Sequence, residues 1–184
     1  MMTVVAAVLV LATAGCQPGS GNHPVPSVPQ IGADLNCRNG DHGYEDQAAG
    51  WGFCYPSTWK YSIRAQKNSA SPSPDELDLT FDITNDPCGK TGCDPSEGLF
   101  AYMIVSTYQR STSTDLASWI QANIHNPPTA EPITWGNSVE AVKLADGRRV
   151  ALTTHHVVIL DLRPGPLDLE GAMSSRLGTW KFSI

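Results

Sequence analysis

The residues of this chain with the most chemistry open to them are its five cysteines. Four of them, Cys37, Cys54, Cys88 and Cys93, lie beyond the N-terminal segment. An even number of cysteines in an exported chain indicates disulfides. We expect the pairs Cys37–Cys54 and Cys88–Cys93, because the residues between the second pair begin and end with glycine and let the chain fold back sharply.

Zinc is the alternative chemistry for the same thiols, with His42 as a further ligand. Structural zinc sites usually hold two cysteines separated by about two to four residues. Cys88 and Cys93 fit that spacing loosely, whereas Cys37 and Cys54 lie far apart in the sequence. The spacing therefore favours disulfides, and we expect no metal and no other cofactor.

The fifth cysteine, Cys16, follows a leader without a single charged residue. The apolar run is shorter than the roughly 20 residues of a membrane-spanning helix, and its length is typical of a secretory signal. Small residues precede the cysteine, and a segment rich in Pro, Gly and Ser follows it. We expect a signal peptide at 1–15, a modified cysteine and flexible tether at 16–36, and one globular domain at 37–184.

Residues Leu11 to Cys16 resemble the lipobox of bacterial lipoproteins. In that family the cysteine thiol receives a diacylglyceryl group, and signal cleavage makes the cysteine the new N-terminus, which is usually acylated as well. The resemblance implies lipidation at Cys16 and a stable anchor at the extracytoplasmic face of the cell membrane. Two features depart from the family pattern: Thr13 stands where Leu is preferred, and the leader has no Lys or Arg. The alternatives are an ordinary secretory signal or a buried N-terminal strand.

Charge narrows the range of partners. The chain has 184 residues and a formal net charge of −6, from 12 basic and 18 acidic side chains. Its basic residues form no stripe that could follow a phosphate backbone, so we expect no nucleic acid partner. Contact with the membrane then depends on the lipid anchor, and the other expected partner is an envelope protein or a small ligand.

Signature motifs of common enzymes do not occur in the sequence. It has no Gly-x-Ser-x-Gly, no phosphate-binding Gly-x-x-x-x-Gly-Lys and no His-Glu-x-x-His. Four carboxylates could serve calcium, but an EF-hand needs glycine at the sixth position of its loop, where this chain has proline, so a solvated acidic loop is favoured. These carboxylates belong to Asp82, Asp86, Asp94 and Glu97. We predict no catalytic residues.

Histidine offers little support for a metal site. His155 and His156 are adjacent in a predicted strand, so they point to opposite faces and cannot bind one ion together. His156 is expected to be a hydrogen-bonded core histidine. His42 lies among carboxylates in residues 41–46, where it could bind a cation, although a hydrated loop is favoured.

Tryptophan is the residue type most suited to a binding surface here. Indole rings stack on ligands and are frequent interface hot spots. Trp51 and Trp135 lie among turn-forming residues, and with His42 they form our candidate binding surface, although core packing is favoured for each tryptophan. Trp119 lies on the apolar stripe of a predicted helix and is expected in the core.

The sequence predicts an α+β domain with a mainly antiparallel sheet and one or two flanking helices, stapled by two disulfides. Strands are expected at 51–55, 60–66, 77–84, 99–108 (a central strand), 138–145, 149–162 and 180–184, helices at 116–124 and 168–177, and a loop at 38–50. Ser113 or Thr114 is the expected cap of the first helix. Asp146-Gly147 predicts a two-residue hairpin turn that places Ala141 opposite Leu152.

A second resemblance covers most of residues 50–184. The segment Phe53, Tyr55, Pro56, Trp59, followed by a helix, a long hairpin and a final Trp-x-Phe strand, is similar to the Mog1/PsbP-like domains of some lipoproteins. That family implies an antiparallel sheet flanked by helices and a non-enzymatic binding or assembly module. It supplies no catalytic residues.

These observations lead to one expectation and two alternatives. We expect a lipid-anchored lipoprotein whose extracytoplasmic domain binds an envelope protein or a small ligand without catalysis. The first alternative is an extracytoplasmic hydrolase whose site forms only in three dimensions. The second is a surface protein with a purely structural role.

Overall fold

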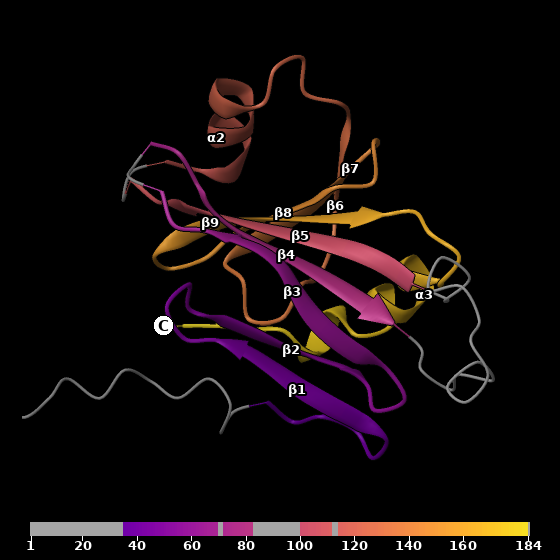
Figure 1. Cartoon of the computed structure of the whole chain (residues 1–184). Coiled ribbons are helices and arrows are strands. Elements are labelled where there is room, and N and C mark those ends of the chain that lie inside the picture. The colour runs from indigo at the N-terminus through magenta and orange to yellow at the C-terminus, as the bar shows by residue number, and fades with distance from the viewer. Residues whose placement is uncertain (1–34, 70–71, 83–99, 112–113, 184) are drawn as a thin grey trace, which may run out of the picture.

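The computed structural model describes residues 35–69, 72–82, 100–111 and 114–183. They form two antiparallel β-sheets packed face to face, and a helix covers the outer face of the larger sheet (Figure 1). The larger sheet has seven strands in the order β3-β4-β5-β9-β8-β7-β6, and the smaller has three in the order β1-β2-β10. The predicted α+β class with a mainly antiparallel sheet is confirmed.

The strands and helices have these bounds: β1 Asp41–Asp46, β2 Trp51–Pro56, β3 Lys60–Lys67, β4 Asp75–Asp82, β5 Phe100–Gln109, α2 Leu116–Asn123, β6 Ala130–Pro132, β7 Glu140–Leu144, β8 Arg149–Leu152, β9 His156–Arg163, α3 Leu169–Ser174, the 3-10 helix η2 Leu177–Thr179, and β10 Lys181–Phe182. Within this described part of the chain, no helix has the length and apolar character needed to cross a lipid bilayer.

Alternating side chains place the central strands as expected. On β4, Leu77, Leu79 and Phe81 are buried between the two sheets, while the residues between them face outward. Strand β5 pairs with β4 on one side and β9 on the other, which confirms the predicted central strand. Period-two alternation thus identifies the inner face of the larger sheet correctly.

Aromatic rings fill the space between the sheets. Phe53 of β2 stacks on Trp180 with 4.7 Å between ring centroids, and Trp135 meets Trp180 edge to face at 5.1 Å. All three rings are fully buried. Offset and edge-to-face pairs stabilise by about 0.5–1.5 kcal/mol each beyond the area that they bury. The aromatic layer therefore joins the small sheet to the large one.

Helix α2 forms the outer layer, over the β8 and β9 half of the large sheet (Figure 1). Its Leu116 and Ile120 join a second apolar cluster with Val150 and Leu152. Asp115 is the N-cap, since its carboxylate accepts a hydrogen bond from the Ser118 amide at 2.8 Å. The predicted cap, Ser113 or Thr114, was therefore wrong.

One of the two predicted disulfides is present. Cys37 and Cys54 are bonded, with 5.5 Å between their Cα atoms, so they fasten the segment before β1 to β2. Cys88 and Cys93 lie outside the described residues, as does Cys16. Their predicted chemistry stays a prediction.

The predicted loop at 38–50 was wrong in its central part, which is strand β1. β1 pairs with β2 along its whole length, from Asp41 opposite Pro56 to Asp46 opposite Trp51. Tyr44 is the only apolar residue of β1 that is buried, and the Asp41 side chain is covered by its ion pair with Arg176. A polar strand of this kind shows no alternation of apolar and polar residues, so the sequence pattern could not predict it. The apolar residues of this strand pair lie mainly on β2.

The hairpin at Asp146-Gly147 exists, but the predicted register was wrong by one residue. Its turn contains three residues, with Gly147 at φ 93° and its amide bonded to the Leu144 carbonyl. This is the three-residue hairpin turn, whose last residue adopts the left-handed conformation and forms a β-bulge. It is not the predicted two-residue turn. Ala141 therefore lies opposite Ala151, and Leu152 points to the other face.

The predicted long strand at 149–162 is interrupted at Thr153. The Thr153 hydroxyl accepts hydrogen bonds from the amides of His155 and His156, which turns the chain between β8 and β9. Hydroxyl side chains favour such turns because they replace backbone partners. His155 is thus an exposed turn residue, and only His156 belongs to a strand.

Candidate functional sites

The first candidate site, which we call the acidic hollow, lies where the β1–β2 turn approaches β3, β4 and β5. It is a small hollow of about 20 Å³, with room for little more than one water molecule. It is lined by Asp46, Ala48, Ala49, Trp51, Gln66, Asn68, Asp75, Glu76, Leu77, Val105 and Thr107. Its carboxylates come from strand ends that are far apart in sequence. Sequence reasoning could not bring these carboxylates together, because no pattern links β1 to β4.

Two of these carboxylates already accept hydrogen bonds from nearby backbone amides. Asp46 Oδ1 accepts a hydrogen bond from the Ala49 amide at 2.9 Å, and Asp75 Oδ1 accepts one from the Ser69 amide at 2.7 Å. Carboxylates that bond backbone amides shape turns as well as ligand sites. Among the described residues, no group of three or more His, Cys, Asp and Glu side chains is arranged to hold a metal ion.

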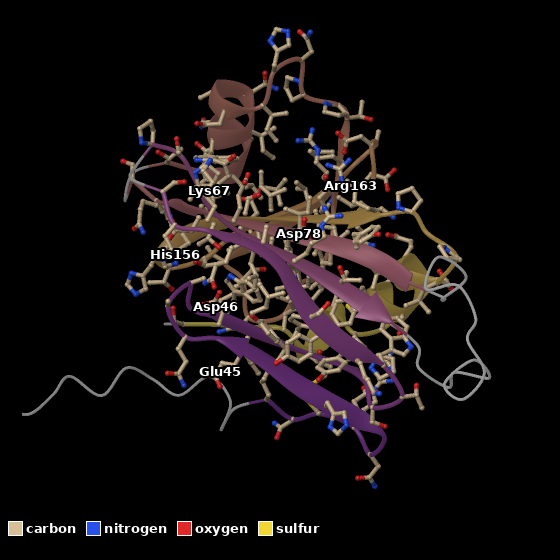
Figure 2. The ribbon with its side chains drawn as sticks, viewed as in Figure 1. Glu45, Asp46, Lys67, Asp78, His156 and Arg163 are labelled. Carbon is tan, nitrogen blue, oxygen red and sulfur yellow. A yellow bond between two sulfur atoms is a disulfide. The ribbon has the colours of Figure 1, made fainter. Side chains whose placement is uncertain are left out.

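His156 adjoins this end of the molecule. Figure 2 shows it at the same end as Asp46 and Lys67. Burial is the main cause that lowers the pKa of His156, and the charge of His155 lowers it further, while Asp75 acts in the opposite direction. A half-buried imidazole with a lowered pKa is neutral at pH 7 and can accept a proton.

The predicted binding surface is only partly a surface. Trp51 and Trp135 are both 0% exposed, as the favoured core packing predicted, so neither ring offers an exposed binding platform. Gly136, at φ 56°, lets the backbone approach Trp180 so closely that a side chain there would clash, and this packs Trp135 inward. His42 is exposed on β1, beside the ring of Tyr55.

Trp51 nevertheless contributes to the acidic hollow. Its indole Nε1 donates a hydrogen bond to Thr107 Oγ1 at 3.1 Å, which satisfies both buried groups. The ring forms an apolar wall of the hollow rather than a face open to solvent. Trp51 therefore serves the core first.

The second candidate site is strand β3, which we call the open edge because it is the last strand of the large sheet. All of its residues are exposed, and Tyr61 and Ile63 are 42% and 50% exposed although they lie on the inward face. Tyr61 meets Tyr44 edge to face at 5.0 Å. Burial, followed by the charge of Asp46, raises the pKa of Tyr44 to about 12, so its hydroxyl stays protonated at neutral pH.

The third candidate site is a groove between α2 and the strands β6 and β7. It has a volume of about 340 Å³, and its walls are mostly apolar: Leu116, Ala117, Ile120, Gln121, Pro127, Pro128, Thr129, Ala130, Glu140 and Val142. Val139, next to this groove in sequence, is 64% exposed. Pro127 and Pro128, which follow the helix in the sequence, form part of the wall of the groove.

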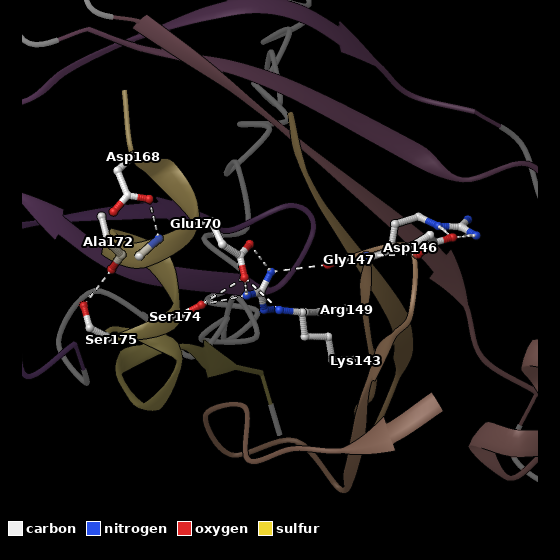
Figure 3. A network of polar contacts seen from close by, with 11 residues as sticks. Lys143, Asp146, Gly147, Arg149, Asp168, Glu170, Ala172, Ser174 and Ser175 are labelled. Carbon is white, nitrogen blue, oxygen red and sulfur yellow. Dashed lines mark hydrogen bonds and ion pairs between the residues drawn. The ribbon is translucent and has the colours of Figure 1, made fainter. Parts of the chain in front are cut away.

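Arg149 on β8 and Glu170 on α3 form an ion pair in which the arginine is buried and the glutamate is half exposed (Figure 3). Arg149, whose side chain is 1% exposed, donates from Nη2 to Glu170 Oε1 at 2.6 Å and from Nη1 to Oε2 at 3.1 Å. Lys143 and Ser174 complete the network. Arg149 is the main cause that lowers the pKa of Glu170 to about 2. The network joins β8 to α3 and is structural.

Comparison with known proteins identifies no relative: no family model matches, no curated protein matches, and no solved structure matches.

Proposed function

We propose that this protein is a lipid-anchored lipoprotein of the cell envelope whose extracytoplasmic domain binds an envelope protein or a small ligand without catalysis. The observation that carries the binding role is the open edge, where Tyr61 and Ile63 stay exposed beside a well-packed core. Exposed apolar side chains on an edge strand favour contact with a partner, because the outer side of such a strand can pair with an added segment.

The anchor rests on the leader and the cysteine that follows it. Cys16 after an apolar run, with a Pro- and Gly-rich spacer, supports lipidation at the extracytoplasmic face of the membrane. The bond between Cys37 and Cys54 supports maturation in an oxidising compartment, where disulfides persist. The similarity to Mog1/PsbP-like domains supports a binding module.

Intact mass spectrometry of the membrane fraction tests the anchor. We expect a mature chain that begins at Cys16 and carries the mass of its acyl groups. The matched control is Cys16→Ala, which should lose those groups and the membrane association. Recovery of the wild-type chain with an unmodified Met1 would contradict the proposal.

The second predicted disulfide is part of the same proposal. Alkylation without reduction should leave Cys88 and Cys93 unlabelled, and reduction should make both reactive. The matched pair Cys37 and Cys54 gives the reference behaviour in the same sample. Labelling of Cys88 and Cys93 before reduction would show that they are free thiols.

Site-specific photocrosslinking in intact cells tests the binding role. A photoreactive residue at Tyr61 should yield a crosslinked product of defined mass, because this ring faces the proposed partner. The same residue at Lys181, on β10 of the small sheet, is the control. Equal products at both positions, or none at Tyr61, would count against the open edge as the binding site.

The acidic hollow favours the alternative, an extracytoplasmic hydrolase. Asp46 and Asp75 line it, and neutral His156 lies within the electrostatic reach of Asp75. Carboxylates and a neutral imidazole are the groups used for proton transfer. The purified protein should then hydrolyse chromogenic ester or glycoside substrates, and His156→Gln should reduce the rate by about a hundredfold or more. Equal turnover by wild type and variant would exclude this role for His156.

A further inference from the structure

The apolar rows of the large sheet end abruptly at the open edge. One row runs from Ala101 through Phe81 to Tyr61, and the next from Met103 through Leu79 to Ile63. The members on β5 and β4 are 0% exposed, whereas Tyr61 and Ile63 are 42% and 50% exposed. Each row therefore has room for one more apolar side chain from a strand placed beside β3.

Backbone groups at this edge match that vacancy. β3 is terminal in the seven-stranded sheet, so no strand among the described residues lies on its outer side. An edge strand presents a row of hydrogen-bonding groups that an extended segment can pair with. Eight residues, Lys60–Lys67, are long enough for a full additional ladder.

The charges on β3 indicate which kind of strand could pair with its outer side. β3 carries Lys60, Arg64 and Lys67 and no carboxylate. Its neighbour β4 has acidic residues opposite two of them. In the observed register, Lys60 lies opposite Asp82 and Lys67 opposite Glu76.

The third basic residue, Arg64, also has an acidic partner on β4. Arg64 bonds Asp78 at 2.6 Å and lies over the ring of Tyr102. Opposite charges across neighbouring strands stabilise a pair, and like charges destabilise it. β4, in which carboxylates alternate with apolar residues, is thus an example of a strand that suits β3.

Self-association at this edge is disfavoured by the same charges. Two copies paired through β3 would bring two basic rows together without a carboxylate between them. The edge therefore selects against a second copy, while an acidic strand meets opposite charge.

We propose that β3 is the docking edge for an extended segment of a partner protein in which acidic and apolar residues alternate. The segment adds as a further strand beside β3. Its carboxylates meet the row of Lys60, Arg64 and Lys67, and its apolar side chains cover Tyr61 and Ile63. This inference rests on the binding role proposed above and names the surface and the chemistry of the partner.

A synthetic peptide tests the proposal directly. The probe copies Asp75–Asp82 (DELDLTFD) with a fluorescent label, and the control peptide replaces its acids by amides (NQLNLTFN). Binding to the purified full chain is followed by fluorescence anisotropy. We expect saturable binding in the range of about 10–100 μM, weakened by salt, and at least about fivefold weaker binding of the control.

Matched variants locate the contact. Lys60→Gln with Lys67→Gln should weaken binding about fivefold and reduce its salt dependence. Ile63→Ser should weaken it about tenfold, whereas Val139→Ser, which removes a similarly exposed side chain beside the α2 groove, should leave it unchanged. Circular dichroism confirms that each variant is folded.

Hydrogen exchange separates the remaining outcomes. The β3 amides that do not bond β4 should exchange more slowly once the peptide is bound. Slow exchange of these same amides in the free chain would mean that a segment of this protein already covers the edge, and a dimer in sedimentation would mean a second copy; either result overturns the inference. Absence of binding up to about 1 mM also overturns it. If the Tyr61 crosslink persists in that case, the binding role stands and only the acidic strand is wrong.

Discussion

The two edges of the large sheet are built differently. β6 has three residues, and Pro132, which cannot donate to a ladder, is one of them. β3 at the other edge has eight residues and exposes Tyr61 and Ile63. Short length and proline are common means of protecting an edge strand. One edge is therefore closed by its own sequence, whereas β3 at the other edge has no pairing strand on its outer side within the described part of the chain.

The same contrast extends to what lies behind each edge. The α2 half of the sheet has apolar clusters on both faces, and its β8 is tied to α3 by the buried Arg149 pair. The β3 side ends in half-exposed rings and lysines. Stability is thus concentrated in the interior and the covered half, and the open edge contributes little to it. The predictions below measure that difference.

The largest effect is expected in the aromatic layer. Trp180→Ala removes a fully buried ring that stacks on Phe53, so the free energy of unfolding should fall by about 3–5 kcal/mol. Urea denaturation measures it. The matched open-edge change, Tyr61→Ala, should cost less than about 1 kcal/mol. Equal losses would remove the distinction between interior and edge.

The disulfide should rank next. Replacing Cys37 and Cys54 by serine opens a loop with a sequence separation of 17, for which the chain-entropy model gives about 3 kcal/mol. Thermal unfolding with and without reductant measures the loss. Reduction of the double variant provides the control, since any remaining effect belongs to another disulfide. No change in the midpoint would show that the segment before β1 is not held by this bond.

The ion pair between Arg149 and Glu170 predicts that the free energy of unfolding depends on pH. Glu170 has its pKa lowered to about 2, chiefly by Arg149. A depressed pKa stabilises the fold above the ordinary value of about 4.5, and this contribution is lost as pH falls through about 2. Because Glu170 is half exposed, solvent screening reduces the contribution to about 1–2 kcal/mol.

Glu170→Gln should accordingly destabilise the protein at pH 7, and the gap from wild type should close between about pH 4.5 and pH 2. Urea titrations across this range measure the gap. Asp161→Asn, which breaks the exposed pair with Arg163, is the control and should change little. A gap that stays constant with pH would mean that the carboxylate charge is not what Arg149 requires.

The smallest effect is expected at the open edge itself. Ile63→Lys should change the free energy of unfolding by no more than about 0.5 kcal/mol, because the side chain is 50% exposed. Leu79→Lys, its cross-strand neighbour, places a charge in the core and should prevent stable folding. Near-ultraviolet circular dichroism distinguishes the two. Comparable damage from both changes would mean that the edge is packed.

Patterns with a strong local signal predicted the fold well. The alternation of Leu77, Leu79 and Phe81 identified β4, and the spacing of Leu116, Trp119 and Ile120 identified α2. Both patterns reflect one apolar face per element, which follows from strand and helix geometry alone. The central position of β5 came from apolar residues on both faces of 99–108, and the α+β class came from the separation of strands and helices along the chain.

Other features depended on partners remote in sequence. β1 is a strand because β2 pairs with it, and the hairpin register depends on whether Gly147 takes the left-handed conformation after a three-residue turn. Trp51 and Trp135 are buried because Trp180, near the other end of the chain, packs against both. Local composition cannot report such contacts.

The sequence by itself determined the candidate anchor at Cys16, the acidic balance, the alternating strands and the amphipathic helix, because each depends only on neighbours along the chain. The tertiary structure alone decided which rings are buried, which carboxylates meet in the acidic hollow and that β3 ends the sheet. The physical reason is that burial and strand pairing are relations between distant segments, and Tyr61 and Ile63 are exposed only because no described strand follows β3.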